Sequence, residues 1–165
     1  MLGAFSMTQM TDPSAALESF QEALNANGAD ELGRSTIDPQ LYAYSDRPNG
    51  IPRITFVRLD DSTVTALVMF VLVDQREDGP RYQIGYAVPE KYRSQGRAKE
   101  IVTAAIAELK RGLSKNGVTG FSVEAIVGKD NEPSMRVAAT TLSTSPTEII
   151  DSVSGLPALH YVRNV

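Results

Sequence analysis

The chain reads Val88-Pro89-Glu90-Lys91-Tyr92-Arg93-Ser94-Gln95-Gly96-Arg97-Ala98 at the point that decides its fold. The residues just before this segment, 82–88, are rich in aromatic and β-branched side chains, which is typical of a strand. After it, apolar residues recur at helical spacing as far as Leu113. The segment is therefore predicted to be a turn that leads from a strand directly into a helix.

The start of this predicted helix has the features of an anion-binding site. Backbone N–H groups in a first helical turn have no partner within the helix, and the peptide dipoles add partial positive charge there. Gly96 has no Cβ, so an oxyanion can approach the backbone closely, and Arg93, Arg97 and Lys99 add full charges. Two interpretations stay open from this loop alone: a phosphate-binding site, or a tight turn with solvated cations.

Two segments resemble motifs of the GNAT superfamily, the acyl-coenzyme-A-dependent N-acyltransferases. Residues 93–98, Arg-Ser-Gln-Gly-Arg-Ala, fit the pyrophosphate-binding signature Arg/Gln-x-x-Gly-x-Gly/Ala of that family. Residues 121–127 are strand-like, and residues 131–136, Asn-Glu-Pro-Ser-Met-Arg, are similar to the Asn-x-x-Ser-x-Arg segment that opens the family's next helix. Two short motifs in the family's order, each at a strand-to-helix junction, support the resemblance better than either alone.

The resemblance implies an α/β fold of the α+β type, with a mixed, mainly antiparallel central sheet flanked by helices. It also implies an N-acetyltransferase that moves an acetyl group from acetyl-CoA to a primary amine by direct attack on the thioester. The Val88 N–H is the first candidate for contact with the oxyanion. The residues expected to bind the coenzyme are Ala87, Val88, Arg93, Ser94, Gln95, Gly96, Arg97, Ala98 and Asn131. The alternative is a GNAT-fold module that binds an acyl-CoA or a partner without turnover.

Three residues are candidates for proton transfer. Glu124 is the carboxylate within the two central strands and the leading base, acting directly or through water, although strand alternation equally allows a solvated residue. Ser134 either donates to the leaving sulfur or caps its helix. Tyr161 is a candidate acid in the last predicted strand, where it and His160 face opposite sides. Tyr86 is a further candidate for acceptor contacts, or a packing residue.

Composition excludes several classes of protein. The 165-residue chain is expected to form one domain, with the coenzyme-binding motifs within residues 82–142. It has no cysteine and one histidine, so disulfides and thiolate sites are excluded and no metal is predicted. The net charge of −4, without a long basic block, argues against nucleic-acid binding. We expect the partner to be a small-molecule or peptide amine.

The expected location is cytoplasmic. The longest apolar run, 64–73, is shorter than the roughly 20 residues that cross a bilayer, so no membrane partner is predicted. Residues 1–10 have no basic region followed by an apolar stretch, so no export signal is expected. An exposed edge strand in a sheet of this kind also allows a homodimer.

The remaining pattern predicts the other elements. A helix is expected between Asp12-Pro13 and Asn27-Gly28, followed by a long loop over 29–52 that shapes the acceptor pocket and holds one short helix at 39–44. The further elements are an antiparallel meander of strands 53–59, 63–73 and 82–88, a second helix at 133–142, and a hairpin of 148–153 with 159–165. Residues 1–11 supply no convincing strand before the first helix, although Phe5 and Met7 allow a short edge strand.

Overall fold

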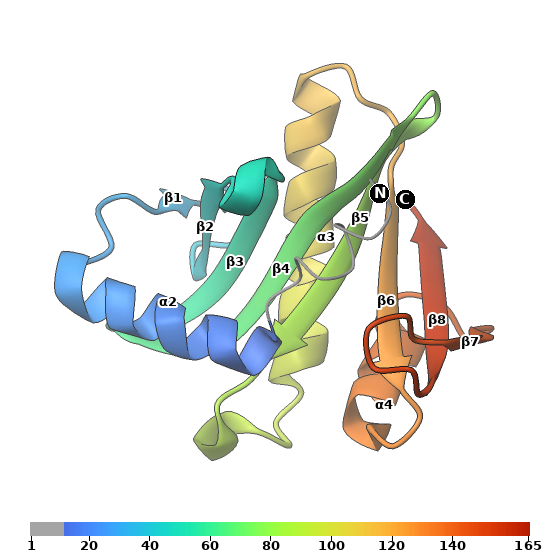
Figure 1. The fold of residues 1–165 in the computed structure, drawn as a ribbon. Coiled ribbons are helices and arrows are strands. Elements are labelled where there is room, and N and C mark those ends of the chain that lie inside the picture. Colours follow the sequence, from blue (N-terminus) through green and yellow to red (C-terminus); the bar gives the residue numbers. More distant parts are fainter. Residues whose placement is uncertain (1–11) are drawn as a thin grey trace.

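The computed structural model describes residues 12–165, and its elements are shown in Figure 1. The helices are α2 (Pro13–Asn27), α3 (Arg97–Lys115) and α4 (Glu132–Thr141), with short 3-10 turns η1 (Pro48–Gly50) and η2 (Glu90–Tyr92). The strands are β1 (Gly33–Arg34), β2 (Leu41–Asp46), β3 (Arg53–Asp60), β4 (Thr63–Arg76), β5 (Gly79–Ala87), β6 (Ser122–Gly128), β7 (Thr147–Ile150) and β8 (Pro157–Asn164).

The strands form one sheet in the order β1-β2-β3-β4-β5-β6-β8-β7. Every neighbouring pair is antiparallel except β5 and β6, which run parallel. That parallel pairing covers three residues on each strand, from Arg81↔Ser122 to Gln83↔Glu124, after which the two strands diverge (Figure 1). The predicted fold, a mixed and mainly antiparallel sheet flanked by helices, is confirmed.

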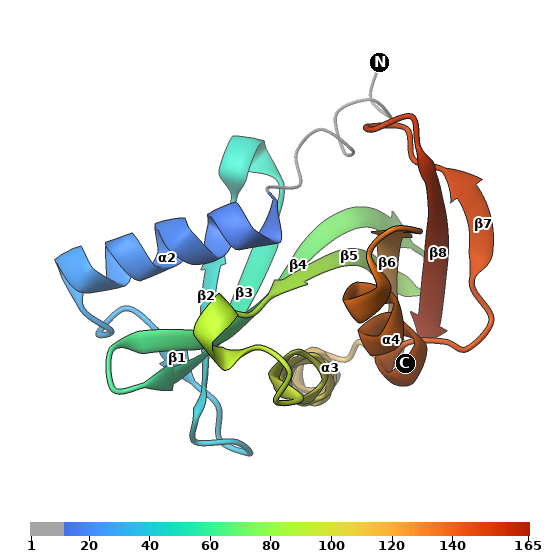
Figure 2. The ribbon, with the colours of Figure 1, turned by 90° about the horizontal axis from the view of Figure 1, so that it is seen from below.

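The helices cover both faces of the sheet. Seen from below, α2 lies on one face while α3 and α4 lie on the other (Figure 2). Strand β4 runs between the two layers, so Val68 and Phe70 pack in the core beneath α3, and Leu67 and Met69 pack in the core beneath α2. Because both faces of β4 are apolar, its sequence is a continuous hydrophobic run instead of an alternating one.

Helix α3 forms as its periodicity predicts. The residues that it buries against the sheet recur at helical spacing: Ile101, Val102, Ala105, Ile106 and Leu109. It ends at Lys115, followed by Asn116 and by Gly117, whose φ of 79° is a left-handed conformation that glycine adopts at little cost. The predicted stop at residues 115–117 is confirmed.

The long loop predicted over 29–52 is wrong. The segment contains strands β1 and β2, and β2 pairs with β3 along its whole length, from Leu41↔Arg58 to Asp46↔Arg53. A strand therefore replaces the short helix predicted at 39–44. Burial of Leu41 in the core and pairing with β3 select the strand here, and neither is visible in the local sequence.

The other predicted elements are confirmed: the first helix, the β3–β4–β5 meander, the helix after β6 and the C-terminal hairpin. The edge strand considered near Phe5 and Met7 lies outside the described residues. Between residues 12 and 165, no helix combines the length and apolar character needed to cross a membrane.

Candidate functional site

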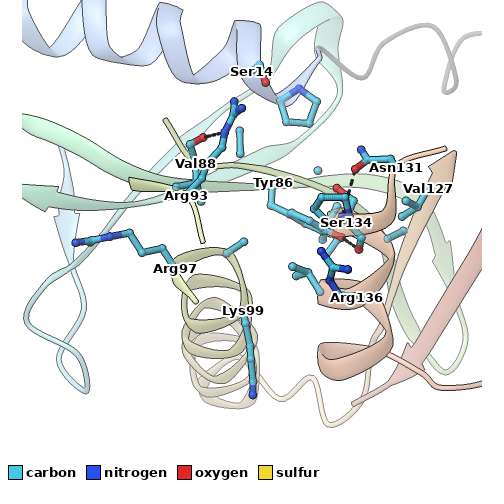
Figure 3. A pocket seen from close by; sticks show the side chains of 18 of the residues that line it. Ser14, Tyr86, Val88, Arg93, Arg97, Lys99, Val127, Asn131, Ser134 and Arg136 are labelled. Carbon is cyan, nitrogen blue, oxygen red and sulfur yellow. Dashed lines mark hydrogen bonds between the residues drawn. The ribbon is translucent and has the colours of Figure 1, made fainter. Parts of the chain in front are cut away.

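A cavity of about 710 Å³ opens where β5 and β6 diverge. Five segments supply its lining: the start of α2, the end of β5, the loop into α3 with its first turn, the end of β6 and the start of α4 (Figure 3). Its volume is within the usual range for small-molecule and cofactor sites. The two motifs that resemble the GNAT family face each other across this cavity.

The diverging strands leave backbone groups free on both sides of the cavity. Strand β5 stays paired with β4 up to Ala87, and β6 stays paired with β8 up to Gly128. Beyond Gln83 and Glu124 their facing edges no longer pair with each other. Unpaired strand edges can hydrogen bond to an extended ligand, as in strand addition.

The first turn of α3 forms one end of the cavity. Gly96 is the N-cap residue, with φ 76° and ψ 8°, and it provides no side-chain cap for the helix. The N–H groups of Arg97, Ala98 and Lys99 therefore have neither an intrahelical partner nor a cap. A Cβ built on Gly96 would meet no atom within 4 Å, so the space beside this backbone is open. The geometry fits an anion such as a pyrophosphate.

The charge of the lining is positive although the chain as a whole is acidic. Four cations line the cavity, namely Arg93, Arg97, Lys99 and Arg136, whereas Asp12 is the one carboxylate among the described lining residues. The Arg93 Nε donates to the Val88 carbonyl at 2.9 Å and so fixes that peptide. Such a cluster attracts a polyanion by focusing positive potential into a concave site.

Tyr92 restricts the position of Arg97, which is one of these four cations. The Arg97 guanidinium lies 5.0 Å from the centroid of the Tyr92 ring, and its Nε donates to the Gln95 Oε1 at 3.1 Å. Both contacts restrict Arg97 beside the first turn of α3, which reduces the entropy lost when it binds an anion.

The structure gathers most of the predicted coenzyme-binding residues in this cavity. Those that line it are Ala87, Val88, Arg93, Ser94, Gly96, Arg97, Ala98 and Asn131. Gln95 is not part of the lining, and its side chain contacts Arg97 instead. Sequence analysis did not select Arg136, although it is the last residue of the second motif, or Ser14, which no local signal marks.

Asn131 and Ser134 lie at the start of α4. The Asn131 Oδ1 accepts a hydrogen bond from the Ser134 N–H at 3.3 Å, so Asn131 and not Ser134 caps this helix. Ser134 lines the cavity, and its side chain also interacts with the Tyr86 hydroxyl. Of the two roles considered for Ser134, capping is excluded and a ligand contact stays open.

Tyr86 reaches from β5 toward α4 inside the cavity (Figure 3). Its hydroxyl donates to the Ser134 carbonyl at 2.7 Å. Burial raises the pKa of Tyr86 to about 12, with the Ser134 side chain opposing the shift and nearby Tyr161 adding to it. The phenol is therefore a neutral hydrogen-bond donor at physiological pH.

Glu124 and Tyr161 do not line the cavity. Glu124 is 7% exposed, and its Oε2 accepts from the Arg81 Nε at 2.8 Å and lies 2.8 Å from the His160 Nε2. The interpretation of Glu124 as a solvated residue is therefore wrong. Tyr161 is buried in the core opposite Ala125. Glu124 lies at the end of the part of β6 that pairs with β5, and Tyr161 lies opposite the next residue, with its side chain outside the cavity lining.

The comparisons with known proteins agree with this geometry. The model of the Acetyltransferase (GNAT) family matches residues 17–141. No curated protein matches the sequence. Within residues 12–165, no group of three or more histidine and acidic side chains is placed to hold a metal ion.

Several solved structures share the fold. A GNAT-family acetyltransferase from Streptococcus pneumoniae is 12% identical, with 68% of this chain and 67% of that chain covered and a TM-score of 0.51. One from Bordetella pertussis is 18% identical, with coverages of 68% and 65% and a TM-score of 0.51. A chimaeric spermidine N-acetyltransferase from Vibrio cholerae is 8% identical, with coverages of 88% and 75% and a TM-score of 0.51. At these identities the likeness concerns the fold.

Proposed function

This chain belongs to the acetyltransferase (GNAT) family of acetyl-CoA-dependent enzymes, and from this premise we propose that it transfers an acetyl group from acetyl-CoA to a primary amine. The observation that carries the proposal is the cationic cavity between the diverging strands, with the uncapped first turn of α3 at its end. One concave site thus offers donors for phosphates and free strand edges for an extended chain.

The coenzyme pyrophosphate is proposed to lie against the first turn of α3. The N–H groups from Gly96 to Ala98 would donate to its oxygens, with Arg93 and Arg97 neutralising the charge. Arg136, on the opposite wall, is placed to contact the same polyanion or the adjacent part of the coenzyme. Ser94 and Gln95 belong to the same loop and would shape its path.

The pantetheine arm is proposed to lie between β5 and β6. The free backbone groups of Ala87 and Val88 on one side, and the Asn131 side chain on the other, would hydrogen bond to its amides. The thioester carbonyl would then lie near the Val88 N–H, which is the proposed oxyanion contact. Arg93 supports this assignment because it anchors the Val88 carbonyl.

The reaction proceeds by direct attack. The neutral amine nitrogen adds to the thioester carbon, a C–N bond forms, and the carbonyl oxygen carries the negative charge. Collapse of this intermediate breaks the C–S bond, coenzyme A leaves as a thiolate that takes up a proton, and the nitrogen loses one proton. Ser134, whose side chain lines the cavity beside the Tyr86 hydroxyl, is the proposed donor to the departing sulfur.

Glu124 is proposed as the base through water and not by direct contact. Its Oε2 already binds Arg81 and His160, whereas Oε1 has no partner among the described residues. Glu124 lies on the same face of β6 as Ile126, which lines the cavity, so the proposed proton transfer to Glu124 runs through water along this face. Tyr161 stays a prediction as an acid; its buried position beneath Tyr86 favours a supporting role.

Isothermal titration tests the proposal. The protein is titrated with acetyl-CoA, coenzyme A and desulfo-CoA, and acetyl transfer is then measured with a panel of primary amines. Saturable one-to-one binding of all three, with amine-dependent release of coenzyme A, is the expected result. Binding without turnover on any amine would favour the non-catalytic acyl-CoA-binding module, and absence of binding would reject the coenzyme site.

A further inference from the structure

A second cavity of about 380 Å³ lies between α2 and strands β2, β3 and β4. Helix α2 lies on the face of the sheet opposite α3 (Figure 2), so the residues that line this cavity place it on that face. Thr55 and Met69 line it from the sheet, and Phe20 and Tyr44 line it with rings that meet edge to face, 6.4 Å between centroids. This volume suits one small molecule and is too small for a folded protein segment.

The second cavity leads toward the coenzyme cavity across the sheet. Tyr44, Thr55, Met69 and Gly85 are successive register partners on β2, β3, β4 and β5. The first three line the second cavity, and Gly85 lines the coenzyme cavity. Adjacent strands are about 4.8 Å apart, so Thr55 and Gly85 are separated by about 10 Å.

Helix α2 borders both cavities with the same side. Pro13, Ala16 and Phe20 follow one another at helical spacing; Pro13 lines the coenzyme cavity, and the other two line the second cavity. A Cβ on Gly85 would lie 2.7 Å from the Pro13 Cγ, so the proline ring rests directly on this glycine. The contact between Pro13 and Gly85 therefore lies along the row of residues that leads from one cavity to the other.

A hydroxyl opens into the second cavity. Thr55 is 4% exposed, yet its hydroxyl is not among the buried polar atoms of residues 12–165 that lack a partner, so it is accessible from the cavity. Water can satisfy this hydroxyl in the absence of a ligand. A ligand that displaces such water must offer a polar group of its own, which indicates that the cavity accommodates more than hydrocarbon.

The charge of this cavity is opposite to that of the coenzyme cavity. Asp46 and Glu31 are in its lining, and Arg53 is the one cation among the described lining residues. Arg53 is already paired at both ends with Asp46, Nε to Oδ1 at 2.9 Å and the second nitrogen to Oδ2 at 2.6 Å. A ligand carboxylate would find no free cation there. Because the same pair neutralises Asp46, the charge left in the described lining is that of Glu31, which favours an ammonium group.

We propose that the second cavity holds the body of the acceptor. The acceptor is a primary amine that a short alkyl chain joins to an aromatic ring, it has no carboxylate, and its amino group is directed toward Gly85. The ring of the acceptor packs against the rings of Phe20 and Tyr44, and its alkyl chain passes over Thr55 and Met69. This inference rests on the proposed acetyl transfer, and it selects one class among the amines that the family accepts.

Acceptor preference tests the proposal first. Acetyl transfer is measured with 2-phenylethylamine, with phenylalanine, which has the same skeleton plus a carboxylate, and with spermidine, which has no ring. The expected kcat/KM is at least about tenfold higher for 2-phenylethylamine than for either comparator. An equal or higher kcat/KM for phenylalanine or spermidine would overturn the proposal.

Two substitutions test the cavity itself. Thr55→Val keeps the shape and removes the hydroxyl, and Asp46→Asn leaves Arg53 as an unpaired cation in the lining. Each is expected to raise KM for 2-phenylethylamine by about three- to tenfold while acetyl-CoA affinity is retained. Asp38→Asn is the matched control, because Asp38 pairs with Arg58 at 2.6 Å and lines neither cavity. Equal KM values in all four proteins would overturn the proposal.

Failure of the proposed function is distinguishable from failure of this inference. If no amine is acetylated, direct titration of 2-phenylethylamine into the wild type and Thr55→Val still tests the cavity. Binding that weakens in the variant supports the cavity as an amine site even without turnover. Binding that is absent in the wild type, in a protein that binds acetyl-CoA normally, overturns it.

Discussion

The paired and the divergent halves of β5 and β6 differ in what they bury. In the paired half, Arg81 on β5, Glu124 on β6 and His160 on β8 share one carboxylate oxygen across three strands. In the divergent half, the same two strands bury no ion pair and line a cavity with free backbone edges. The charged side chains of the first half pair with one another, whereas the cations that line the cavity at the second half are available to bind a ligand.

This difference shows where to look for function on a continuous strand. Glu124 has a charged side chain in a central strand, yet its contacts mark it as part of the framework that holds β5, β6 and β8 together. The residues of the divergent half are mostly small or apolar, and they contribute through backbone groups. A charged residue in a strand is therefore a weaker indicator of the functional site than the point at which two neighbouring strands stop pairing.

The largest expected effect is a loss of acetyl-CoA affinity at the anion site that a change in helix stability alone would not produce. Gly96→Val adds a side chain in the open space beside the first turn of α3 and is expected to weaken acetyl-CoA binding at least about a hundredfold, measured by titration. Gly117→Val is the control. Gly117 has a φ of 79°, close to the 76° of Gly96, and its surroundings at the other end of the helix are equally open. Both variants carry a similar backbone strain of about 1–2 kcal/mol. Equal losses of affinity would contradict the assignment.

A substitution in the paired half is expected to lower the free energy of unfolding. Glu124→Gln leaves the Arg81 guanidinium without its charge partner, which is expected to lower the free energy of unfolding by about 2–3 kcal/mol. Urea denaturation measures this, with Glu148→Gln as a control in the exposed Lys129–Glu148 pair, where little change is expected. Retained acetyl-CoA affinity with a reduced kcat would support Glu124 as the base; an unchanged kcat would remove it from the site.

Alkaline pH tests the phenol that joins β5 to α4. The pKa of Tyr86 is raised by burial to about 12, above its value near 10 in an unfolded chain. Stability from this group is therefore complete below pH 10 and is lost as the pH rises from 10 through 12, by about 2.7 kcal/mol in all. Tyr86→Phe is expected to lose less stability than the wild type between pH 9 and pH 11.5 in urea denaturation. Parallel losses in both proteins would contradict the buried, neutral phenol.

The smallest expected effect concerns a single cation of the divergent half. Arg136→Gln is expected to weaken acetyl-CoA binding by about tenfold and to reduce its salt dependence, because one charge is removed from the lining. Lys110→Gln is the control, since Lys110 is exposed on α3 and lies outside the cavity. Equal affinities of the two variants would show that Arg136 does not contact the coenzyme.

Local patterns predicted the site better than they predicted its surroundings. The loop before α3 and the Asn131 segment were identifiable because helix starts have recognisable residues, and eight of the nine predicted coenzyme-binding residues line the cavity. Strand β2 was missed because its polar residues give no clear alternation, and only pairing with β3 makes it a strand. Ser14 and the second cavity were invisible because they depend on how α2 lies over the sheet.

The sequence by itself determined the family, the strand–loop–helix unit and the absence of cysteine chemistry, because each depends on residue types at short spacing. The tertiary structure decided that Glu124 is paired, that Arg136 faces the loop before α3, and that α2 divides two cavities of opposite charge. These depend on contacts between residues far apart in the chain. Burial and charge pairing are properties of that packing, and no local pattern encodes them.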